Sequence, residues 1–353
     1  MTIEDRDEAY EDGDEEELPD IEFSALADQA DLPAWTGTTA ADLEALIAAV
    51  PTLYEQIERP KKRSGVRIVY QLPRKQPMPR QLRAIQRAVA RSIAVALPFP
   101  PCVYGVADHP QRPRGARRSI VNHARQHLGH KQVLRCDLRD FFDQVRQPQV
   151  REVFARLGAR GTAVDCLTRL CTLDDRIPQG ASSSPAIANV AARVLDEDLM
   201  RLAARTGCIY TRYVDDLVFS GDWVVEVAEV AEFVTRHGFA LNDAKTRLQR
   251  RGGSQYVTGL NVSDPARPHV PAAFKRRLRS MLRIAAEKKG FEPGMRKKLL
   301  GMVAYVRAAD ESVARAHRRD GTQVPTFGDR MLALFQEADA GGAAVQGNVS
   351  ESR

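Results

Sequence analysis

The most informative stretch of the chain is Tyr210-Thr211-Arg212-Tyr213-Val214-Asp215-Asp216-Leu217-Val218-Phe219-Ser220. Its two adjacent carboxylates, Asp215 and Asp216, lie between largely apolar runs that are rich in β-favouring residues. This pattern predicts a tight β-hairpin with the acids at its tip. Buried apolar flanks do not normally carry paired charges unless a cation neutralises them, and carboxylate oxygens suit hard cations such as Mg²⁺. The stretch therefore indicates a metal-binding hairpin.

A third carboxylate, Asp137, ends another apolar run, residues 133–137. If the two strands lie side by side, about 4.8 Å apart, the acids of both converge. Such a cluster can hold two metal ions roughly 4 Å apart, the spacing used in nucleotidyl transfer. An isolated acid pair is equally typical of an ordinary turn. The pair Asp174-Asp175 lies in a polar stretch, and there we predict a solvated loop.

Charge is distributed unevenly along the 353 residues, which carry a net charge of +6. Residues 1–20 hold eleven acids against one arginine, a net of −10, so the remaining chain carries +16. A basic body is the electrostatic footprint of a polyanionic partner, although an arginine-rich composition also serves solubility. The acidic lead is predicted to be disordered. One hypothesis for its role is competition with nucleic acid for the basic surface.

The five cysteines show no Cys-x-x-Cys spacing and are odd in number, which argues against a disulfide framework or a zinc site. The N-terminus is acidic and no apolar run reaches about 18 residues, so we expect neither a signal peptide nor a membrane span. These features predict a cytoplasmic protein without membrane contact. The hydrophobic fraction of 43% permits a full core, and the length predicts two or three structural units.

Hydrophobic periodicity places several helices. Thr39 begins a segment with the spacing of a capping box, and the helix that follows is expected to end at Pro51. Further helices are expected over residues 82–97, 224–237 and 274–286, the last of them basic and amphipathic.

Two further motifs suit contacts with a nucleotide. Phe141 and Phe142 follow Asp137 closely. Phe141 is expected in the core, whereas the Phe142 ring can stand beside the nucleotide sugar, where it would clash with a 2′-hydroxyl and select deoxynucleotides. Gly180 lets the backbone approach a ligand closely, and Gln179 can hydrogen-bond a base or sugar edge. The second segment is also typical of a polar loop that precedes a helix.

The basic residues near these motifs have two interpretations. A predicted hairpin with Gly65 at its turn carries Lys62 and Arg67, which suit clamping of a triphosphate, although a basic run is more often a solvated face. Lys245 taken alone indicates a surface lysine. Beside the acids it would protonate the leaving pyrophosphate or screen its charge.

Taken together and in this order, the segments resemble a reverse transcriptase from about Tyr54 to about Tyr305, most of the chain. The resemblance is carried by Lys62 to Ile68, similar to the fingers motif; by Asp137 to Phe142 and Pro178-Gln179-Gly180, similar to the first two palm motifs; by Tyr213 to Asp216, similar to the catalytic hairpin; and by Lys245, at the place of a later palm lysine.

Within that superfamily the chain looks most like the retron-type bacterial enzymes. Arg118-Ser119-Ile120 is similar to their sequence before the palm, and Val257-Thr258-Gly259 resembles their RNA-recognition signature. Their Asn-Ala-x-x-His segment is only approximate in residues 122–127, where His123 stands at the usual asparagine position. A metal site at His123 and His127 has no evident third ligand, so an exposed or RNA-facing role is the preferred interpretation.

The resemblance implies an α+β fold with a right-hand polymerase architecture of fingers, a palm with an antiparallel sheet, and a helical thumb. The implied organisation is an acidic disordered tail over residues 1–38, fingers with N-terminal helices over 39–130, the palm over 131–265, the thumb over 266–335 and a disordered tail over 336–353. Template and primer would be held without sequence readout by the thumb. The implied RNA-binding residues are Asn122, His127, Val257, Thr258, Gly259, Lys275 and Arg276.

The resemblance also implies the chemistry, RNA-directed DNA polymerisation. Asp137, Asp215 and Asp216 would hold two Mg²⁺ ions, with Mn²⁺ as the alternative. The implied partners are dNTPs, a structured noncoding RNA that serves as template and primer, a host RNase H that trims the RNA, and a separate effector protein in phage defence. Two alternatives stay open: another defence-associated or group II intron-like reverse transcriptase, and an inactive RNA-binding scaffold.

Overall fold

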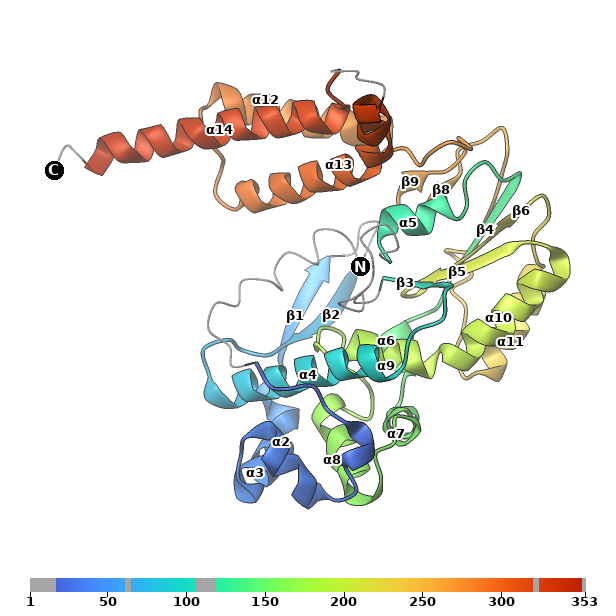
Figure 1. Cartoon of the computed structure of the whole chain (residues 1–353), viewed down its shortest axis with the longest axis vertical. Helices are drawn as coiled ribbons and strands as arrows, with labels where there is room; N and C mark the ends of the chain where they lie inside the picture. Colours follow the sequence, from blue (N-terminus) through green and yellow to red (C-terminus); the bar gives the residue numbers. More distant parts are fainter. Residues whose placement is uncertain (1–16, 61–64, 106–117, 320–323, 351–353) are drawn as a thin grey trace. The chain divides into compact units, whose positions relative to one another are not determined.

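The computed structural model describes residues 17–60, 65–105, 118–319 and 324–350 (Figure 1). The described chain forms two compact units. The first unit comprises Asp14–Ser119 and Gln132–Leu248, and the second contains Ile120–Lys131 and Gln249–Arg353. This division differs from the predicted fingers, palm and thumb boundaries, which stay an interpretation. The mixture of helices and sheets within the first unit confirms the predicted α+β class.

The first unit begins with short helices, where the sequence predicted disorder. They are η2 (Phe23–Ala25), η3 (Gln29–Asp31) and α2 (Leu32–Thr36). Phe23 is buried, and its ring centroid lies 6.0 Å from that of Phe154. The predicted disordered tail is therefore wrong for residues 17–38, because apolar side chains among the acids pack into the core. Residues 1–16 of that predicted tail lie outside the described residues.

Helix α3 (Ala40–Leu53) begins as predicted, since the Asp42 N–H donates to the Thr39 hydroxyl at 3.1 Å. The helix does not end at Pro51, as expected, but continues to Leu53. The buried side chains of Ile47 and Val50 hold this last turn against the core, which outweighs the poor helix propensity of proline.

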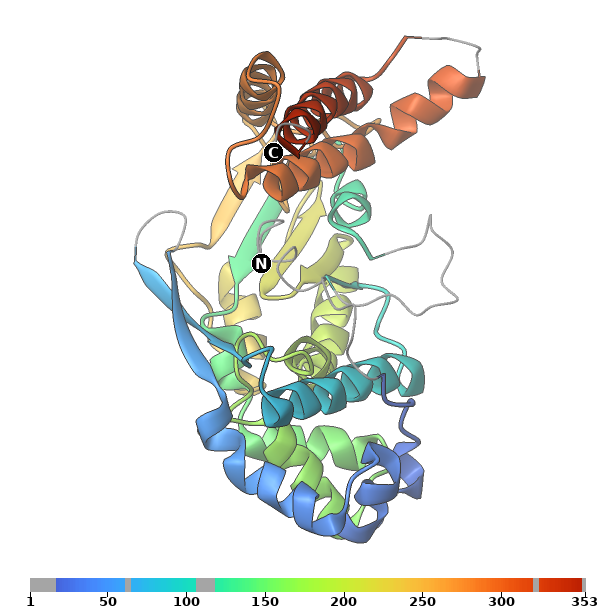
Figure 2. The ribbon, with the colours of Figure 1, turned by 90° about the vertical axis from the view of Figure 1, so that its left-hand side faces the viewer.

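The predicted basic hairpin is present and is followed by a long helix (Figure 2). Strands β1 (Glu55–Pro60) and β2 (Val66–Gln71) pair in antiparallel register. Gly65 precedes β2 with a φ of 85°, a left-handed conformation that glycine adopts without strain. Helix α4 (Pro77–Ala96) then buries the apolar face predicted from its periodicity.

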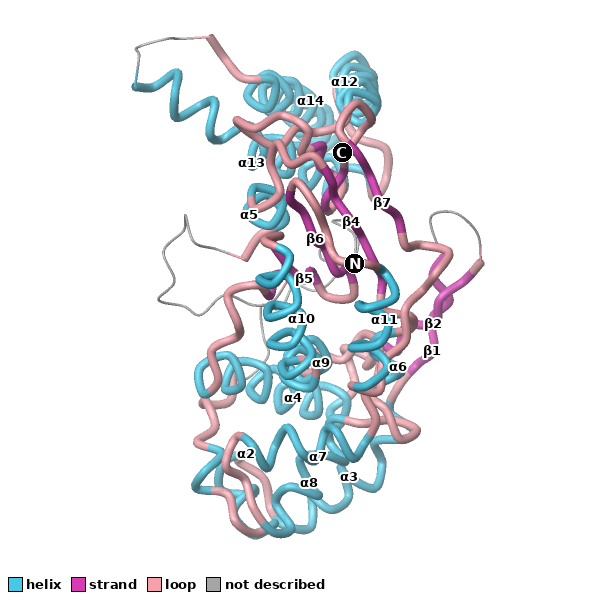
Figure 3. The backbone as a smooth tube through the Cα atoms, turned by 90° about the vertical axis from the view of Figure 1, so that its right-hand side faces the viewer, coloured by secondary structure: helices cyan, strands magenta, loops and turns pink. Residues whose placement is uncertain are grey.

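A five-stranded sheet forms the centre of the first unit, in the order β3-β5-β6-β4-β7 (Figure 3). Its strands are β3 (Val103–Tyr104), β4 (Gln132–Asp137), β5 (Ile209–Tyr213), β6 (Asp216–Gly221) and β7 (Arg247–Arg250). Strands β4 and β5 each pair antiparallel with β6, whereas β3 pairs parallel with β5. Almost every residue of β5 and β6 is buried, so these two strands form the inner part of the sheet.

The first unit also contains the helices α6 (Phe141–Gln144), α7 (Gln147–Arg156), α8 (Gly161–Cys171), α9 (Ser184–Ala191), α10 (Arg193–Thr206) and α11 (Val227–Arg236). Helix α10 packs against β5, and α11 packs against α10. The helix predicted near residues 224–237 is thus α11. After α11, Leu241 forms an isolated antiparallel bridge with Leu138.

The second unit contains α5 (Ile120–Arg125), β8 (Tyr256–Val257), β9 (Leu260–Asn261), α12 (Ala272–Glu287), α13 (Met295–Arg319) and α14 (Phe327–Ser350). Helix α14 packs against both α12 and α13 (Figure 1). In this structure α14 continues through residues 336–350, where the sequence predicted a disordered tail. None of the described helices is both long and apolar enough to cross a membrane.

Candidate active site

The hairpin predicted from the acid pair is the junction of β5 and β6. Tyr213 and Asp216 are opposite each other in the antiparallel register, so the turn between them consists of Val214 and Asp215. Val214 has a φ of 58°, in the left-handed region that a β-branched residue seldom adopts. Val214-Asp215 is therefore a two-residue hairpin turn, and we call it the catalytic turn after the role that the sequence predicts for its acid.

Strand β4 lies beside β6 and brings Asp137 next to the acids of the hairpin. Asp137 is directly opposite Asp216 in the register, and side chains that are opposite in an antiparallel pair lie on one face with Cβ atoms about 4.5–5.5 Å apart. The N–H of Leu138 donates to the Asp215 carbonyl at 2.8 Å, which links the end of β4 to the turn. The predicted adjacency of the two strands is confirmed.

Two basic side chains bind these acids in the structure. The Lys245 ammonium donates to both carboxylate oxygens of Asp137, at 2.7 and 3.0 Å. On the strand, Arg135 lies two residues before Asp137, hence on the same face, and its Nη2 lies 2.6 Å from an oxygen of Asp216. Sequence reasoning placed Lys245 near the acids but assigned no role to Arg135, whose only signal was a cation within an apolar strand.

Electrostatics at the cluster oppose full ionisation of the acids. Burial raises the pKa of Asp216 to about 6; Arg135 opposes the rise, and the charges of Asp215 and Asp137 add to it. Burial and the charge of Asp215 likewise raise the pKa of Asp137, against the lowering effect of Lys245. Burial tends to lower the pKa of Lys245, but its bond to Asp137 and the nearby carboxylates raise it overall. The cluster therefore holds more negative charge than its two cations neutralise.

The chemistry of this donor set fits a divalent cation. Carboxylate oxygens are the ligands that Mg²⁺ prefers, and a cation would relieve the mutual repulsion that raises the pKa of Asp137 and Asp216. Within the residues that the structure describes, no group of three or more acids, histidines or cysteines is already arranged to hold a metal ion. Lys245 and Arg135 bond to Asp137 and Asp216 instead, so metal binding would require these two cations to share or release carboxylate oxygens.

The predicted nucleotide-binding residues lie on nearby elements of the first unit. Gln179 and Gly180 form a loop that docks on β2, where the Tyr70 N–H donates to the Gln179 carbonyl at 2.8 Å. A side chain at Gly180 would collide with the Tyr70 carbonyl, so the close backbone approach seen here is to β2, and the approach to a ligand stays a prediction. Phe142 is half-buried on α6, and its ring centroid lies 5.7 Å from that of Phe141, which is buried as predicted.

Of the two basic residues predicted to bind the triphosphate, only Arg67 lies within the described residues. Arg67 is half-buried on β2, opposite Arg59 in the register. Lys62 lies outside the described residues. Their assignment to the triphosphate stays a prediction.

The predicted RNA-binding residues are gathered in the second unit. Thr258, in the turn between β8 and β9, donates its hydroxyl to the Ile120 carbonyl at 3.1 Å and so ties that turn to α5. On α5, the Asn122 side-chain oxygen accepts from Arg125 at 2.7 Å. Gly259 is exposed, whereas Val257 is fully buried and serves the core.

The exposure expected for the histidine pair is wrong, whereas its part in RNA recognition stays a prediction. His123 and His127 are both completely buried, with ring centroids 5.4 Å apart in an edge-to-face arrangement. Burial lowers the pKa of His127 to about 3, so its ring is neutral. The reason is that α5 packs against β9, which encloses the face that carries these residues.

The thumb residues named from the sequence lie on α12. Lys275 is half-buried, with its ammonium 5.2 Å from the centre of the Phe327 ring, and Arg276 is exposed. Arg279, one turn further along, also lies over Phe327, at 5.0 Å. The exposed face of α12 is therefore basic, as predicted.

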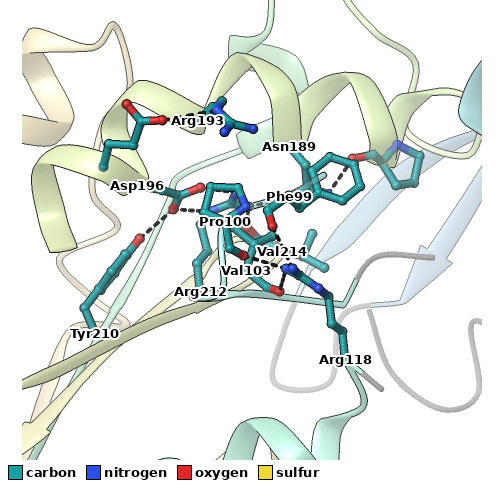
Figure 4. Close-up of polar contacts among 12 residues, drawn as sticks. Phe99, Pro100, Val103, Arg118, Asn189, Arg193, Asp196, Tyr210, Arg212 and Val214 are labelled. Atoms are coloured by element: carbon teal, nitrogen blue, oxygen red, sulfur yellow. Dashed lines mark hydrogen bonds and ion pairs between the residues drawn. The ribbon is translucent and has the colours of Figure 1, made fainter. Parts of the chain in front are cut away.

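One feature behind the catalytic turn was missed from the sequence (Figure 4). Arg212 is completely buried and bonds to the equally buried Asp196, with an N–O distance of 2.6 Å. The signal was visible as a charged residue in the middle of an apolar strand. The sequence did not show which acid would pair with Arg212, because Asp196 is sixteen residues away on α10.

Comparison with known proteins agrees with the geometry. The family described as Reverse transcriptase (RNA-dependent DNA polymerase) matches residues 60–289. The Retron Mx65 reverse transcriptase of Myxococcus xanthus is 35% identical over 289 residues, 74% of this chain and 64% of that protein. The Retron Ec86 reverse transcriptase of Escherichia coli is 34% identical over 208 residues, 58% of this chain and 60% of that protein. The matches therefore span less than two thirds of the length of these relatives.

A solved structure of telomerase from Candida tropicalis, in complex with a fragment of telomeric RNA, is similar to this chain with a TM-score of 0.43 and 10% identity. The similarity covers 80% of this chain and 59% of the telomerase chain. The family match extends from β1 through α12 and contains Asp137, Asp215 and Asp216. The chain therefore belongs to the reverse transcriptase (RNA-dependent DNA polymerase) family.

Proposed function

We propose that this protein is an RNA-directed DNA polymerase of the retron type, which copies a structured noncoding RNA into DNA by two-metal nucleotidyl transfer. One observation carries the proposal: β4 and β6 bring Asp137 opposite Asp216, with Asp215 in the adjoining turn, within a region that matches the reverse transcriptase family. Three acids on one hairpin and its neighbouring strand supply the negative charge that two divalent cations require.

The acids have distinct tasks in this proposal. Asp137 and Asp215 would hold both cations, and Asp216, bonded to Arg135, would complete or orient the site. Bound Mg²⁺, or Mn²⁺, would activate the primer hydroxyl and neutralise the triphosphate and its leaving pyrophosphate. The chain's own contribution is to fix the positions of the carboxylates, since phosphoryl transfer depends mainly on positioning and charge stabilisation.

The remaining site residues would act on the nucleotide. Lys245 bonds to Asp137 here and is 57% exposed, so it has the freedom to turn toward a pyrophosphate and protonate it or screen its charge. Phe142 would exclude a 2′-hydroxyl, and the loop of Gln179 and Gly180 would contact the base or sugar. Arg67 and Lys62 would bind the triphosphate.

Template and primer would be bound mainly through the backbone. Lys275 and Arg276 lie on the basic helix α12, and cations of this kind hold phosphates without reading sequence. Asn122, Thr258 and Gly259 would recognise the cognate RNA from the second unit, with His127 and Val257 supporting them from the core. Binding should then weaken steeply as salt concentration rises.

The retron assignment rests on the resemblance and on the names of the curated relatives. It implies a product in which DNA is joined to the noncoding RNA (msDNA), trimming of the RNA by a host RNase H, and work with a separate effector protein in defence against phages. Another defence-associated or group II intron-like reverse transcriptase would share the same catalytic residues. It would differ in the nucleic acid that it copies.

The catalytic proposal is tested by comparing Asp215→Asn with Asp175→Asn in primer extension on an RNA template. Both substitutions remove one carboxylate from a tight turn, but Asp175 is exposed and has no place in the proposed site. Loss of a group that stabilises the transition state should lower the rate by about a thousandfold or more for Asp215→Asn. Asp175→Asn should match the wild type. Full activity of Asp215→Asn would refute the metal assignment, and a wild type inactive on every template would favour the RNA-binding scaffold.

The retron proposal is tested by sequencing the nucleic acid that co-purifies with the full chain. We expect a single structured RNA joined to a DNA copy of part of its own sequence. In the Asp215→Asn variant the RNA should remain and the DNA should be absent. An intron RNA, or RNA of many sequences, would favour one of the other reverse transcriptase classes.

A further inference from the structure

The catalytic turn contains a residue in a costly conformation. Val214 is β-branched, has a φ of 58° and is only 6% exposed. A left-handed conformation of such a residue costs of the order of 1–3 kcal/mol, and it persists only where the surroundings determine it. The surroundings of Val214 therefore have to hold both its main chain and its side chain.

The main chain is held by a buried guanidinium. Arg212 donates to the Val214 carbonyl at 2.8 Å from Nη1. This carbonyl belongs to the peptide that joins Val214 to Asp215. On the other side of Asp215, its own carbonyl accepts from Leu138 at 2.8 Å. Both peptide planes that flank Asp215 are thus fixed, and with them the direction in which its carboxylate points.

The guanidinium is itself held by the helices that pack against the sheet (Figure 4). Asp196 on α10 binds Arg212 with both oxygens, at 2.8 and 2.6 Å, and Asn189 on α9 accepts from Nη1 at 2.7 Å. Tyr210 donates to Asp196 at 2.8 Å. Because these residues lie on two helices and a strand, the guanidinium cannot move without displacing the core around it.

The side chain of Val214 is held from strand β3. Gly105, with a φ of 75°, directly follows β3 and lies against the turn. A Cβ at Gly105 would lie 2.9 Å from Cγ2 of Val214, closer than real Cβ atoms approach, and 3.1 Å from the Tyr213 ring, which is a tight contact. Because Gly105 has no side chain, Val214 can pack directly against it.

We propose that Arg212 and Gly105 are positioning residues that clamp the catalytic turn and so place the Asp215 carboxylate for metal binding. Neither touches the substrate; they act through Val214. The inference rests on the proposed function, in which Asp215 is a metal ligand. A buried ion pair by itself adds little net stability. The inference gives the pair of Arg212 and Asp196 a different task, which is to position the turn.

The test compares Gly105→Ala with Gly207→Ala. Both glycines have positive φ, 75° and 67°, so both substitutions add similar backbone strain. No atom lies within 4 Å of a Cβ at Gly207, which follows α10 away from the turn, whereas a Cβ at Gly105 meets Val214. The readouts are Mn²⁺ affinity by water-proton relaxation, the thermal unfolding midpoint, and kcat and KM for dNTP in primer extension.

Gly105→Ala should weaken Mn²⁺ binding by about tenfold and lower kcat on the order of 10- to 100-fold with little change in KM, since a misplaced ligand affects the reaction more than nucleotide binding. Gly207→Ala should keep the wild-type values of all three. The double variant Gly105→Ala/Val214→Ala removes the colliding methyl group, so it should recover at least about fivefold of the lost kcat.

Equal behaviour of Gly105→Ala and Gly207→Ala, or a double variant no better than Gly105→Ala, would overturn the clamp. If Gly105→Ala does not fold, Asn189→Ala decides: it removes one anchor of Arg212 and leaves Asp196 in place, so Mn²⁺ affinity should fall about threefold. Unchanged affinity there would refute the inference. A wild type that binds Mn²⁺ but makes no DNA would instead refute the proposed function and leave the clamp testable by metal binding.

Discussion

The catalytic turn and the turn at Asp174-Asp175 have the same size but opposite surroundings. In each, two residues join a pair of positions that face each other across an antiparallel bridge: Tyr213 and Asp216 for the first, Leu173 and Arg176 for the second. Both contain left-handed residues. The chain therefore has an acid pair at two tight turns, and the residues around each pair determine its role.

The two turns differ in how the left-handed backbone is obtained. Asp174 and Asp175 have φ values of 48° and 64° and are exposed, and aspartate adopts this conformation at low cost. The catalytic turn places Val214 there and buries it, with Arg212 behind it. One turn is formed by residues that suit it, and the other is imposed by the core. The predictions below test this contrast.

The largest effect is expected when the ion pair behind each turn is broken. Asp196→Asn leaves the fully buried Arg212 without its carboxylate and should lower the free energy of unfolding by about 3 kcal/mol or more. Asp143 pairs with Arg176 beside the other turn at 3.4 Å, where both side chains are partly exposed. Asp143→Asn should therefore cost less than about 1 kcal/mol. Urea denaturation followed by circular dichroism measures both, and similar losses would remove the contrast.

A smaller effect is expected when valine is introduced into the exposed turn. Asp175→Val places a β-branched residue at a φ of 64° in an exposed turn, where no core packs around its side chain, so the free energy of unfolding should fall by about 1–2 kcal/mol. Asp175→Asn is the control and should leave it unchanged, because asparagine tolerates this conformation. Primer extension should stay at the wild-type rate in both. A valine variant as stable as the wild type would mean that Val214 needs no support.

The contrast also explains what the sequence could predict. The hairpin, the strand ending in Asp137 and their adjacency followed from β-favouring runs and from acids at their ends, which are local patterns. The clamp did not follow, because Arg212 obtains its role from Asp196 and Asn189 on two separate helices. Likewise, the burial of His123 and His127 depends on β9, which is distant in sequence from α5.

The two terminal segments of the chain also differ from what the sequence predicted. Charge density in the acidic lead concealed Phe23 and Leu32, which pack into the core. The alanine-rich end was expected to fray but continues α14 to Ser350. In the acidic lead composition suggested disorder, whereas a few apolar contacts decided the structure.

The smallest effect is expected when Asp216, the half-buried acid that follows the catalytic turn, is neutralised. Burial raises the pKa of Asp216 to about 6, whereas an unfolded aspartate has a pKa of about 3.9. Between these values the unfolded chain ionises first, so the wild-type free energy of unfolding should fall as pH rises from about 4 to about 6 and then stay low. Asp216→Asn cannot ionise. In EDTA it should therefore be more stable than the wild type at pH 7.5 by roughly 1 kcal/mol, after allowance for the lost bond to Arg135.

The advantage of Asp216→Asn should itself depend on pH. At pH 4, Asp216 is protonated in the folded wild type and about half protonated in the unfolded chain, so most of the advantage of Asp216→Asn should disappear. Urea denaturation of the wild type and of Asp216→Asn at pH 4 and pH 7.5 measures this change. An Asp216→Asn protein that is less stable than the wild type at pH 7.5 would mean that Arg135 already compensates the buried charge, and that the acid cluster is held together without any need for a metal ion.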